Sequence, residues 1–405
     1  MIKNNNNIKL GEVAEFRNGV NYNETNFGTG IKIINVANFK DYSKPNYEEL
    51  SEINPNELIK EDDLLQKGDI VFVRSNGNKN LIGRTLYIDE IEDDLTYSAF
   101  CIRTRFVSKE CNPRFYAYLF KTNLIRQNLS SQGNGTNISN LNQKILNNLV
   151  VPKPSMEKQN KIVSILSKYD DLIENNVRRI KLLEESAELI YKEWFINLKF
   201  PGYEKYNIVD GIPDGWEKKL VKEFGEVITG KTPPTKRSEY YDGDIPFIKT
   251  PDMSEIYVIK TNQSLTEEGA KSQVNKYVPK NTILVSCIGT VGVVSLTSEL
   301  SQFNQQINGL VPNKDNYLYY MYFKFKSLKE HLEALGSSGA TMLNVNKGKF
   351  ENIEVLEPSK EVLDNFMNIC KSIFNNILNL QYQNETLKEA RDILIPRLIS
   401  GEIEV

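Results

Sequence analysis

Histidine and cysteine are scarce in this chain of 405 residues, which has one histidine, His331, and four cysteines. Cys101, Cys111, Cys287 and Cys370 form no CxxC pair, so the sequence argues against a zinc site built from cysteine and histidine. A Ser-His-Asp triad would have only His331 to draw on, and that residue lies in a lysine-rich stretch. We expect buried cysteines and a surface histidine.

Long apolar runs are also missing, which bears on membrane association. The most apolar stretch, residues 282–296, is too short to span a bilayer and is interrupted by glycine and serine. The first residues are polar and do not resemble a signal peptide. We therefore expect a cytoplasmic protein that has no membrane partner.

An excess of basic charge is lacking as well. The 50 lysines and arginines are outnumbered by 53 aspartates and glutamates, and the formal net charge is −3. Nothing in this overall charge indicates nucleic-acid binding. A DNA-binding role would have to rest on local basic loops, or on a partner that supplies positive charge.

Catalytic motifs are absent, with one apparent exception. The chain has neither the Asp/Asn-Pro-Pro-aromatic sequence of methyltransferases nor a GxGxxG motif after a strand, and no Glu-x-Lys follows Asp252 as in a nuclease motif. Residues 225–232 match the GxxxxGK[ST] pattern of a P-loop ATPase. Pro233 and Pro234 follow at once and oppose the helix that a P-loop requires there. We interpret the segment as a loop and expect no catalysis, no cofactor and no metal.

Two stretches carry the apolar pattern of long helices that pack on a partner helix. The first has seam positions in steps of four and three: Ile162, Leu166, Tyr169, Ile173, Asn176, Ile180, Leu183, Ala187, Ile190 and Trp194. The second lies 204 positions later: Phe366, Cys370, Ile373, Ile377, Leu380, Asn384, Leu387, Arg391, Leu394 and Leu398. We expect the two helices to pack on each other.

The asparagines in the two seams indicate the direction of packing. Facing positions of an antiparallel pair add to one total, and Asn176 with Asn384 gives the same total as Ile162 with Leu398. A buried amide is costly without a partner, and two facing amides would satisfy each other and fix the register. We predict an antiparallel coiled coil with Asn176 opposite Asn384. The competing interpretation is that each seam packs on its own globular domain.

The remainder of the chain repeats itself. Residues 1–152 and 201–358 each alternate short β-type runs with turns, and Lys153-Pro-Ser155 before the first helix is echoed by Glu357-Pro-Ser359 before the second. This is a tandem duplication of a β-rich domain followed by a long helix. We predict an α+β fold with two similar domains (1–152 and 201–358), each followed by a helical region (153–200 and 359–405), with Ser155 as the first N-cap.

The duplication predicts a geometry. Two similar domains joined through an antiparallel helix pair would be related by a pseudo-two-fold axis. Helices of about 33 residues would form a rod on the order of 50 Å long. A duplex presents the same groove face about every 34–36 Å. Two DNA readers would therefore lie one helical turn or somewhat more apart, over two half-sites that differ because the loops differ.

Polar loops between the repeated anchors supply candidate DNA contacts, because Arg, Asn and Gln reach base edges and Lys neutralises phosphates. In the first domain these are Arg74, Asn76, Lys79, Asn80, Arg84, Gln132, Asn134, Thr136 and Asn137. In the second they are Lys231, Thr232, Lys236, Arg237, Lys249, Gln302, Gln305, Gln306, Ser338, Thr341 and Asn344. The same composition is also that of an ordinary surface loop. Near the end of the first helix, Trp194 and Phe195 read as an exposed aromatic pair suited to a protein partner.

The arrangement as a whole resembles a known family. Gly-Lys-Thr-Pro-Pro at 230–234, Gly-Ala-Thr at 339–341, Leu-Val-Val-Pro-Lys-Pro at 149–154 and Leu-Ile-Pro-Arg-Leu-Ile-Ser-Gly-Glu-Ile at 394–403 accompany the order domain, helix, domain, helix. In this the chain is similar to the specificity subunit of type I restriction–modification systems over essentially its whole length.

The resemblance implies a non-catalytic subunit with two target recognition domains that read a bipartite, asymmetric site in double-stranded DNA. It implies that the helical regions act as a spacer and dock two DNA adenine methyltransferase subunits and the restriction/translocase subunits. Joint clamping of DNA with such partners would also fit the acidic net charge. The alternative from another class is a coiled-coil scaffold that binds protein without reading DNA.

Overall fold

The computed structural model describes residues 6–39, 44–55, 59–76, 81–91, 93–123, 125, 129, 140–337 and 343–405. The chain forms two compact units, one of Met1–Asp171 with Leu387–Val405 and the other of Leu172–Thr386. Across the described ranges, no helix combines the length and the apolar composition needed to cross a membrane. The units are taken in turn.

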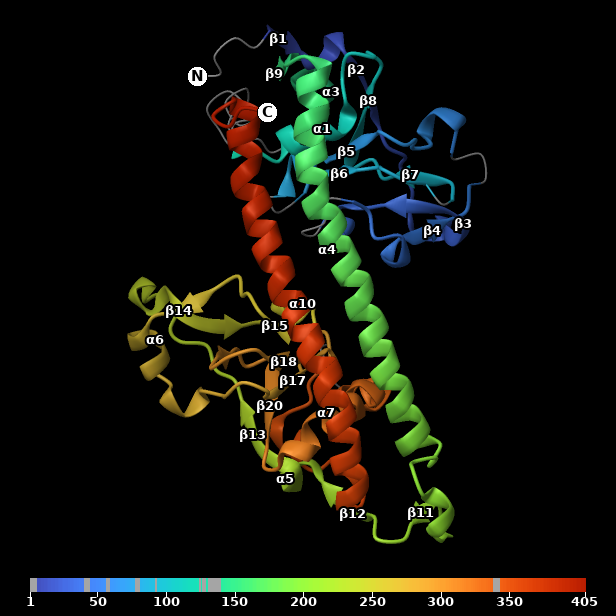
Figure 1. Cartoon of the computed structure of the whole chain (residues 1–405), viewed down its shortest axis with the longest axis vertical. Coiled ribbons are helices and arrows are strands. Elements are labelled where there is room, and N and C mark those ends of the chain that lie inside the picture. Colours follow the sequence, from blue (N-terminus) through green and yellow to red (C-terminus); the bar gives the residue numbers. More distant parts are fainter. Residues whose placement is uncertain are drawn as a thin grey trace. The chain divides into compact units, whose positions relative to one another are not determined.

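The first unit is built on two small sheets (Figure 1), with strand orders β2-β8-β5-β6 and β4-β3-β7. The strands are β2 (Ala14–Asn18), β3 (Phe27–Ile34), β4 (Ser51–Ile53), β5 (Ile70–Val73), β6 (Thr85–Tyr87), β7 (Leu95–Tyr97) and β8 (Cys101–Phe106). β5 is buried throughout, because Ile70 and Phe72 face one apolar cluster while Val71 and Val73 face another. β5 and β6 form an antiparallel pair.

Helices cover one face of the larger sheet in this unit. They are α1 (Pro113–Phe120), α3 (Gln143–Asn148), the start of α4 (Met156–Tyr191) and the end of α10 (Lys360–Ser400). Ile162 and Leu166 share a buried cluster with Leu398, so the start of α4 packs beside the end of α10, as in an antiparallel pair. The Ser155 hydroxyl accepts the Lys158 backbone N–H at 3.3 Å, which confirms the expected N-cap.

A buried ion pair joins α4 and α10 in the first unit. Arg391 Nη1 lies 2.7 Å from Asp170 Oδ1, and the two side chains are only 11% and 7% exposed. The Tyr118 hydroxyl donates to the other carboxylate oxygen. Burial, with a smaller contribution from Arg391, lowers the pKa of nearby Lys121 to about 8. One carboxylate thus faces two basic side chains at this helix contact.

The second unit repeats this plan (Figure 1). Its sheets have the orders β13-β20-β17-β18-β15 and β16-β14-β19. The strands are β13 (Gly225–Thr229), β14 (Tyr241–Ile248), β15 (Tyr257–Val258), β16 (Ser264–Leu265), β17 (Ile283–Ser286), β18 (Val294–Thr297), β19 (Gln302–Phe303) and β20 (Ile307–Pro312). The short helices are α5 (Val221–Phe224), α6 (Glu267–Lys271), α7 (Leu318–Ser327), α8 (Lys329–Gly336) and α9 (Lys347–Glu351).

Strand pairing confirms the duplication. β13-β20-β17-β18 matches β2-β8-β5-β6 strand for strand, with every neighbouring pair antiparallel. β14, like β3, has an irregular antiparallel register with one neighbour and a parallel pairing with the other. A two-stranded ribbon also closes each domain: β1 (Asn6–Lys9) pairs with β9 (Val150–Lys153), and β12 (Glu217–Leu220) pairs with β21 (Glu354–Glu357). A further ribbon, β10 (Ile208–Val209) with β11 (Ile212–Pro213), lies in the linker. The expected α+β fold with two similar β-rich domains is confirmed.

The two seams meet within the second unit as well. Asn176 Nδ2 donates to Asn384 Oδ1 at 3.0 Å, and both side chains are buried. The rings of Trp194 and Phe366 pack 5.9 Å apart. Since later residues of α4 face earlier residues of α10, the helices run antiparallel, as predicted.

The expected exposure of Trp194 and Phe195 is wrong. Each is 9% exposed. The helix widens into a π-helical turn at Lys192–Ile196, and its extra residue shifts the faces that follow. Phe195 packs edge-on against Tyr320 of α7, with centroids 4.8 Å apart. These rings therefore belong to the core of the second unit.

We expect the effects of replacing the two asparagines on the free energy of unfolding to be coupled rather than additive. Asn176→Leu leaves the Asn384 amide buried without its partner and should lower the free energy of unfolding by about 1–3 kcal/mol. The double variant Asn176→Leu/Asn384→Leu should regain most of that loss, because neither amide is then left unpaired. Urea unfolding of the four proteins of this cycle measures the coupling, and additive losses would contradict it.

Candidate nucleic-acid interface

Four backbone hydrogen bonds join separate loops along one edge of the second domain. Gly230 N–H donates to Ile307 O (3.1 Å) and Lys231 N–H to Phe303 O (2.9 Å). The remaining two run from Cys287 N–H to Gln306 O (2.7 Å) and from Val345 N–H to Cys287 O (2.9 Å). We call residues 230–237, 287–289, 303–307 and 343–345 the domain 2 loop edge. Here the structure brings together several of the predicted DNA-contacting residues.

Basic and amide side chains stand out from this edge. Lys231, Lys236, Arg237 and Gln305 are exposed. The Thr232 hydroxyl donates to Gln305 Oε1 at 2.6 Å, which ties the first loop to the turn before β20. The backbone next to Lys249 lies beside the same turn, because Asn304 N–H donates to Ile248 O. The Lys249 amine lies 5.9 Å from the Phe247 ring centroid.

Gln306 presents a defined set of donors. Asn304 Oδ1 accepts the Gln306 backbone N–H at 3.1 Å, so the other amide atom of Asn304 is the NH₂ donor. That donor lies 2.9 Å from Gln306, which must therefore turn its carbonyl oxygen inward. Among the described residues the Gln306 NH₂ group has no hydrogen-bond partner, so it can donate to a ligand. Such a group recognises hydrogen-bond acceptors, such as O6 and N7 of guanine or O4 of thymine.

Gln302 does not fit its predicted role. Its side chain is fully buried. Its amide donates to Ala270 O at 3.0 Å and accepts from the Gln273 amide at 2.8 Å. An amide used up inside the domain cannot reach a base, so the prediction is wrong for Gln302. Asn344, by contrast, is exposed on the domain 2 loop edge.

The first domain has a matching edge. Four backbone bonds correspond one to one with those of the second domain: Gly19 N–H to Cys101 O, Val20 N–H to Tyr97 O, Arg74 N–H to Phe100 O and Leu141 N–H to Arg74 O. We call residues 18–20, 73–76, 98–101 and 140–141 the domain 1 loop edge. The two edges share a backbone framework and differ in their side chains.

The two described arginines predicted to contact DNA in the first domain have partners inside it. Arg74 Nη1 donates to Ala99 O and Arg84 Nη1 to Phe39 O, both at 3.3 Å. Both side chains and that of Asn76 are half-buried. Their contact with DNA stays a prediction. The other candidates lie outside the described residues: Lys79, Asn80, Gln132, Asn134, Thr136, Asn137, Ser338 and Thr341.

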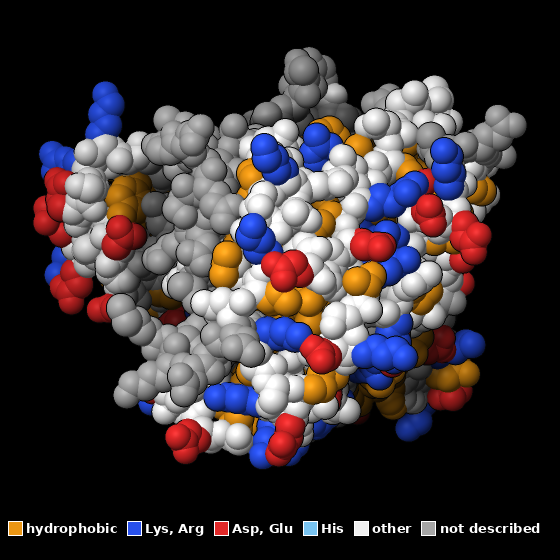
Figure 2. All heavy atoms as spheres, turned by 90° about the horizontal axis from the view of Figure 1, so that it is seen from above, with side chains coloured by type: hydrophobic (Ala, Val, Ile, Leu, Met, Phe, Trp, Pro, Cys, Tyr) orange, Lys and Arg blue, Asp and Glu red, His pale blue; other side chains and the backbone are white. Residues whose placement is uncertain are grey.

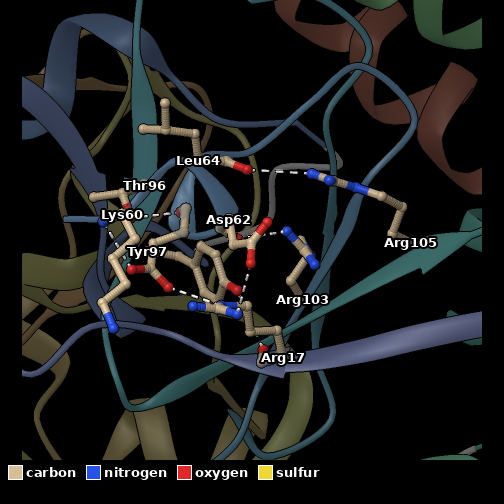
Figure 3. A network of polar contacts seen from close by, with 9 residues as sticks. Arg17, Lys60, Asp62, Leu64, Thr96, Tyr97, Arg103 and Arg105 are labelled. Carbon is tan, nitrogen blue, oxygen red and sulfur yellow. Dashed lines mark hydrogen bonds and ion pairs between the residues drawn. The ribbon is translucent and has the colours of Figure 1, made fainter.

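Three further arginines of the first domain serve its own structure (Figure 3). Arg17 Nε donates to Asp63 Oδ1 at 2.8 Å, and Arg103 Nη1 donates to Asp62 O at 2.9 Å. Arg105 donates to Leu64 O at 3.2 Å. It also holds Asp69 with two bonds of 2.7 Å. These side chains fasten the 60–69 segment to β2 and β8. They are therefore not free cations for phosphates.

Charge is mixed on the face drawn in Figure 2. Among the coloured side chains there, lysine and arginine lie interspersed with aspartate and glutamate and do not form one block. Tight binding of a phosphate backbone requires many unopposed cations. The side chains coloured on this face therefore offer no single block of unopposed cations.

Phe100 was missed by the sequence analysis. It is 61% exposed on the domain 1 loop edge, where its carbonyl takes the place that Gln306 occupies in the second domain. A phenylalanine next to a strand ordinarily reads as core. The signal was its position in the turn Ser98-Ala-Phe100, between two strands that are themselves buried.

The cysteines are buried and the histidine lies on the surface. All four cysteines are free and buried, and burial raises the pKa of Cys101, Cys287 and Cys370 to about 12, as expected of structural thiols. His331 is exposed. No group of three or more metal-binding side chains was found in the described part of the chain.

The P-loop motif lacks the required structure. Residues 225–229 are the strand β13 itself, and Gly230–Arg237 contain no α-helix. A P-loop needs a helix to begin at its Lys-Thr pair. The match in sequence is therefore not a nucleotide site.

Comparison with known proteins agrees with this geometry. The family model for the type I restriction modification DNA specificity domain matches residues 2–185 and 213–394. The type I restriction enzyme HindI specificity subunit of Haemophilus influenzae is 30% identical, with 84% of this chain and 87% of that protein covered. The MjaIX specificity subunit of Methanocaldococcus jannaschii is 28% identical, covering 71% and 68%.

A solved structure shares the fold. The crystal structure of the type I restriction–modification S subunit from M. genitalium matches with a TM-score of 0.52 and 15% identity, over 98% of each chain. Two specificity domains in one chain, two matching loop edges and these relatives lead to one conclusion. This chain belongs to the family of type I restriction–modification specificity subunits, which determine the DNA sequence specificity of those systems.

Proposed function

We propose that this chain is the non-catalytic subunit that selects a bipartite, asymmetric site in double-stranded DNA, acting in the cytoplasm. Residues 1–152 and 201–358 are the two target recognition domains. Residues 153–200 and 359–405 form the helical spacer that docks two DNA adenine methyltransferase subunits and the restriction/translocase subunits. The observation that carries the proposal is the pair of loop edges with one backbone framework and different side chains.

Different side chains on equivalent frameworks imply two different half-sites. The domain 2 loop edge offers an outward amide donor at Gln306 and cations at Lys231 and Lys236. The domain 1 loop edge carries the apolar Phe100 at the position that corresponds to Gln306. Phosphate contacts position a protein, whereas base contacts specify the sequence. An asymmetric target follows. Because the chain is acidic overall, partner subunits supply part of the positive charge that holds the DNA.

The test is a map of methylated adenines in host DNA with and without the gene. We expect loss of N6-methyladenine from one split motif with a fixed unread gap and both strands modified. If the map is unchanged, co-purification decides: a chain that brings down no methyltransferase and does not bind duplex DNA would be the scaffold alternative.

Gln306→Glu should change base preference in one half-site only. Glutamate keeps the inward acceptor for Asn304 and loses the outward donor, so preference should move from guanine or thymine towards cytosine, whose N4 group donates. The discrimination at stake is about 1–3 kcal/mol. Methylation motifs of the two complexes measure it. Asn365→Asp adds the same charge at an exposed position of α10 outside this edge and is the control, and an unchanged motif in Gln306→Glu would refute the assignment.

A further inference from the structure

Phe100 is a large apolar side chain held outward on the domain 1 loop edge. It is 61% exposed, while its neighbours Tyr97 and Cys101 are fully buried. A single exposed apolar residue is ordinary on a protein surface and by itself indicates nothing. The informative features are the hydrogen-bonded backbone that holds Phe100 and the residue at the equivalent position of the second domain.

The backbone at this position is fixed. The Phe100 carbonyl accepts from Arg74 N–H at 2.7 Å and from Ser75 N–H at 3.3 Å. Ala99 N–H donates to Val20 O, and Cys101 N–H to Ser98 O, both at 2.8 Å.

The strand before the turn is anchored by Tyr97, whose hydroxyl donates to Arg17 O at 3.3 Å within the network of Figure 3. A rigid turn limits the entropy lost when its side chain makes a contact.

The corresponding position in the second domain has the opposite chemistry. The bond from Cys287 N–H to Gln306 O repeats the bond from Arg74 N–H to Phe100 O. Gln306 offers a donor there, and Phe100 offers only an apolar surface. Among groups on base edges in the major groove, the apolar one is the 5-methyl group of thymine.

We propose that Phe100 is a specificity-determining residue that recognises a thymine in the first half-site through its 5-methyl group. The proposal rests on the function proposed above and deepens it. It assigns to domain 1 an apolar reading position at the place where domain 2 reads hydrogen-bond acceptors.

The experiment uses the full chain assembled with its methyltransferase subunits and a duplex that carries the mapped motif. Each thymine is replaced in turn by 2′-deoxyuridine, which lacks only the methyl group. For the unaltered complex, one such replacement in one half-site should weaken binding about fourfold, the value of one buried methyl-sized group.

Phe100→Ala should weaken binding to the thymine duplex and show no further loss with deoxyuridine at that position. Phe100→Leu should retain part of the sensitivity. Val107→Ala is the matched control, because Val107 is 57% exposed at the opposite end of β8. It should behave as the unaltered protein.

Three results would overturn the inference. One is that no thymine replacement in either half-site matters. Another is that losses from Phe100→Ala and deoxyuridine add. The third is that Phe100→Ala weakens binding with no link to any single thymine, as expected of a side chain that wedges between base pairs. Failure of the unaltered complex to bind the duplex would instead refute the proposed function.

Discussion

Replacing Asp170 with alanine should lower the free energy of unfolding of the first unit by about 3–5 kcal/mol, the usual result of removing one partner of a buried pair. Asp170 is the carboxylate that faces Arg391 at 2.7 Å, and it also accepts the Tyr118 hydroxyl. Without it, the guanidinium of Arg391, only 11% exposed, keeps its charge and loses that partner.

A matched control lies one residue away. Asp171 contacts Arg114 at 3.5 Å but is 63% exposed, so Asp171→Ala should cost less than about 1 kcal/mol. Hydrogen exchange of the amides in α1 and in the last turns of α10 measures the first unit within the full chain. Equal losses for the two variants would show that the buried pair adds nothing beyond a surface one.

Lys121 adds a pH dependence whose sign can be worked out. Burial lowers its pKa in the folded state to about 8, below the value of about 10.4 in an unfolded chain. The unfolded state therefore binds more protons between these values, and the stability of the first unit should rise as the pH increases from about 8 to about 10.4. The loss in Asp170→Ala should be smaller at pH 9 than at pH 7, since neutral Lys121 no longer adds an uncompensated charge.

Removing three cations from the domain 2 loop edge should produce the largest change in DNA binding. The variant Lys231→Ala/Lys236→Ala/Arg237→Ala should weaken binding on the order of 10- to 100-fold at moderate salt and should reduce the slope of log affinity against log salt by about 3. All three side chains are exposed. Loss of the two lysines should not change the methylated motif, because phosphate contacts carry no sequence information, and a changed motif in the triple variant would place Arg237 on a base edge.

The control removes the same charge from another part of the domain. Lys218, Lys222 and Lys360 are exposed around the β12–β21 ribbon, and their replacement by alanine should leave the salt slope nearly unchanged. Titration of the complete methyltransferase complex with its target duplex at several salt concentrations gives both slopes. Similar slopes for the two triple variants would mean that the domain 2 loop edge does not face the phosphates.

The helical part of the fold was predictable from the sequence because one rule governs it. Seam positions repeat in steps of four and three, and the two asparagines sit where an antiparallel register pairs them. The rule also places Trp194, whose ring packs on Phe366, but it does not account for Phe195, where a π-helical turn changes the period and rings from the second domain cover the outer face. Neither event leaves a periodic trace in the sequence.

The loop edges were only partly predictable. Composition marked Gln305 and Gln306, which lie on the domain 2 loop edge, but it marked Gln302 equally, and only the fold reveals that Gln302 fills the core with its amide paired to Gln273. Phe100 escaped notice because exposure of an aromatic residue depends on the tertiary position of its turn. Gln302 contacts Gln273 and Gln305 contacts Thr232, so contacts between residues far apart in sequence decide the surroundings of these two side chains.

The closing ribbons have a consequence for how such chains change over time. β1 pairs with β9 and β12 pairs with β21, so each recognition domain leaves the scaffold beside the point where it entered. Asn6 and Lys153 are paired at one of these junctions, and Glu217 and Glu357 are paired at the other. A segment with adjacent ends can be exchanged for another of different length without stretching the helices. Recombination between related genes at these two ribbons would replace one domain in a single event and leave both long helices unchanged.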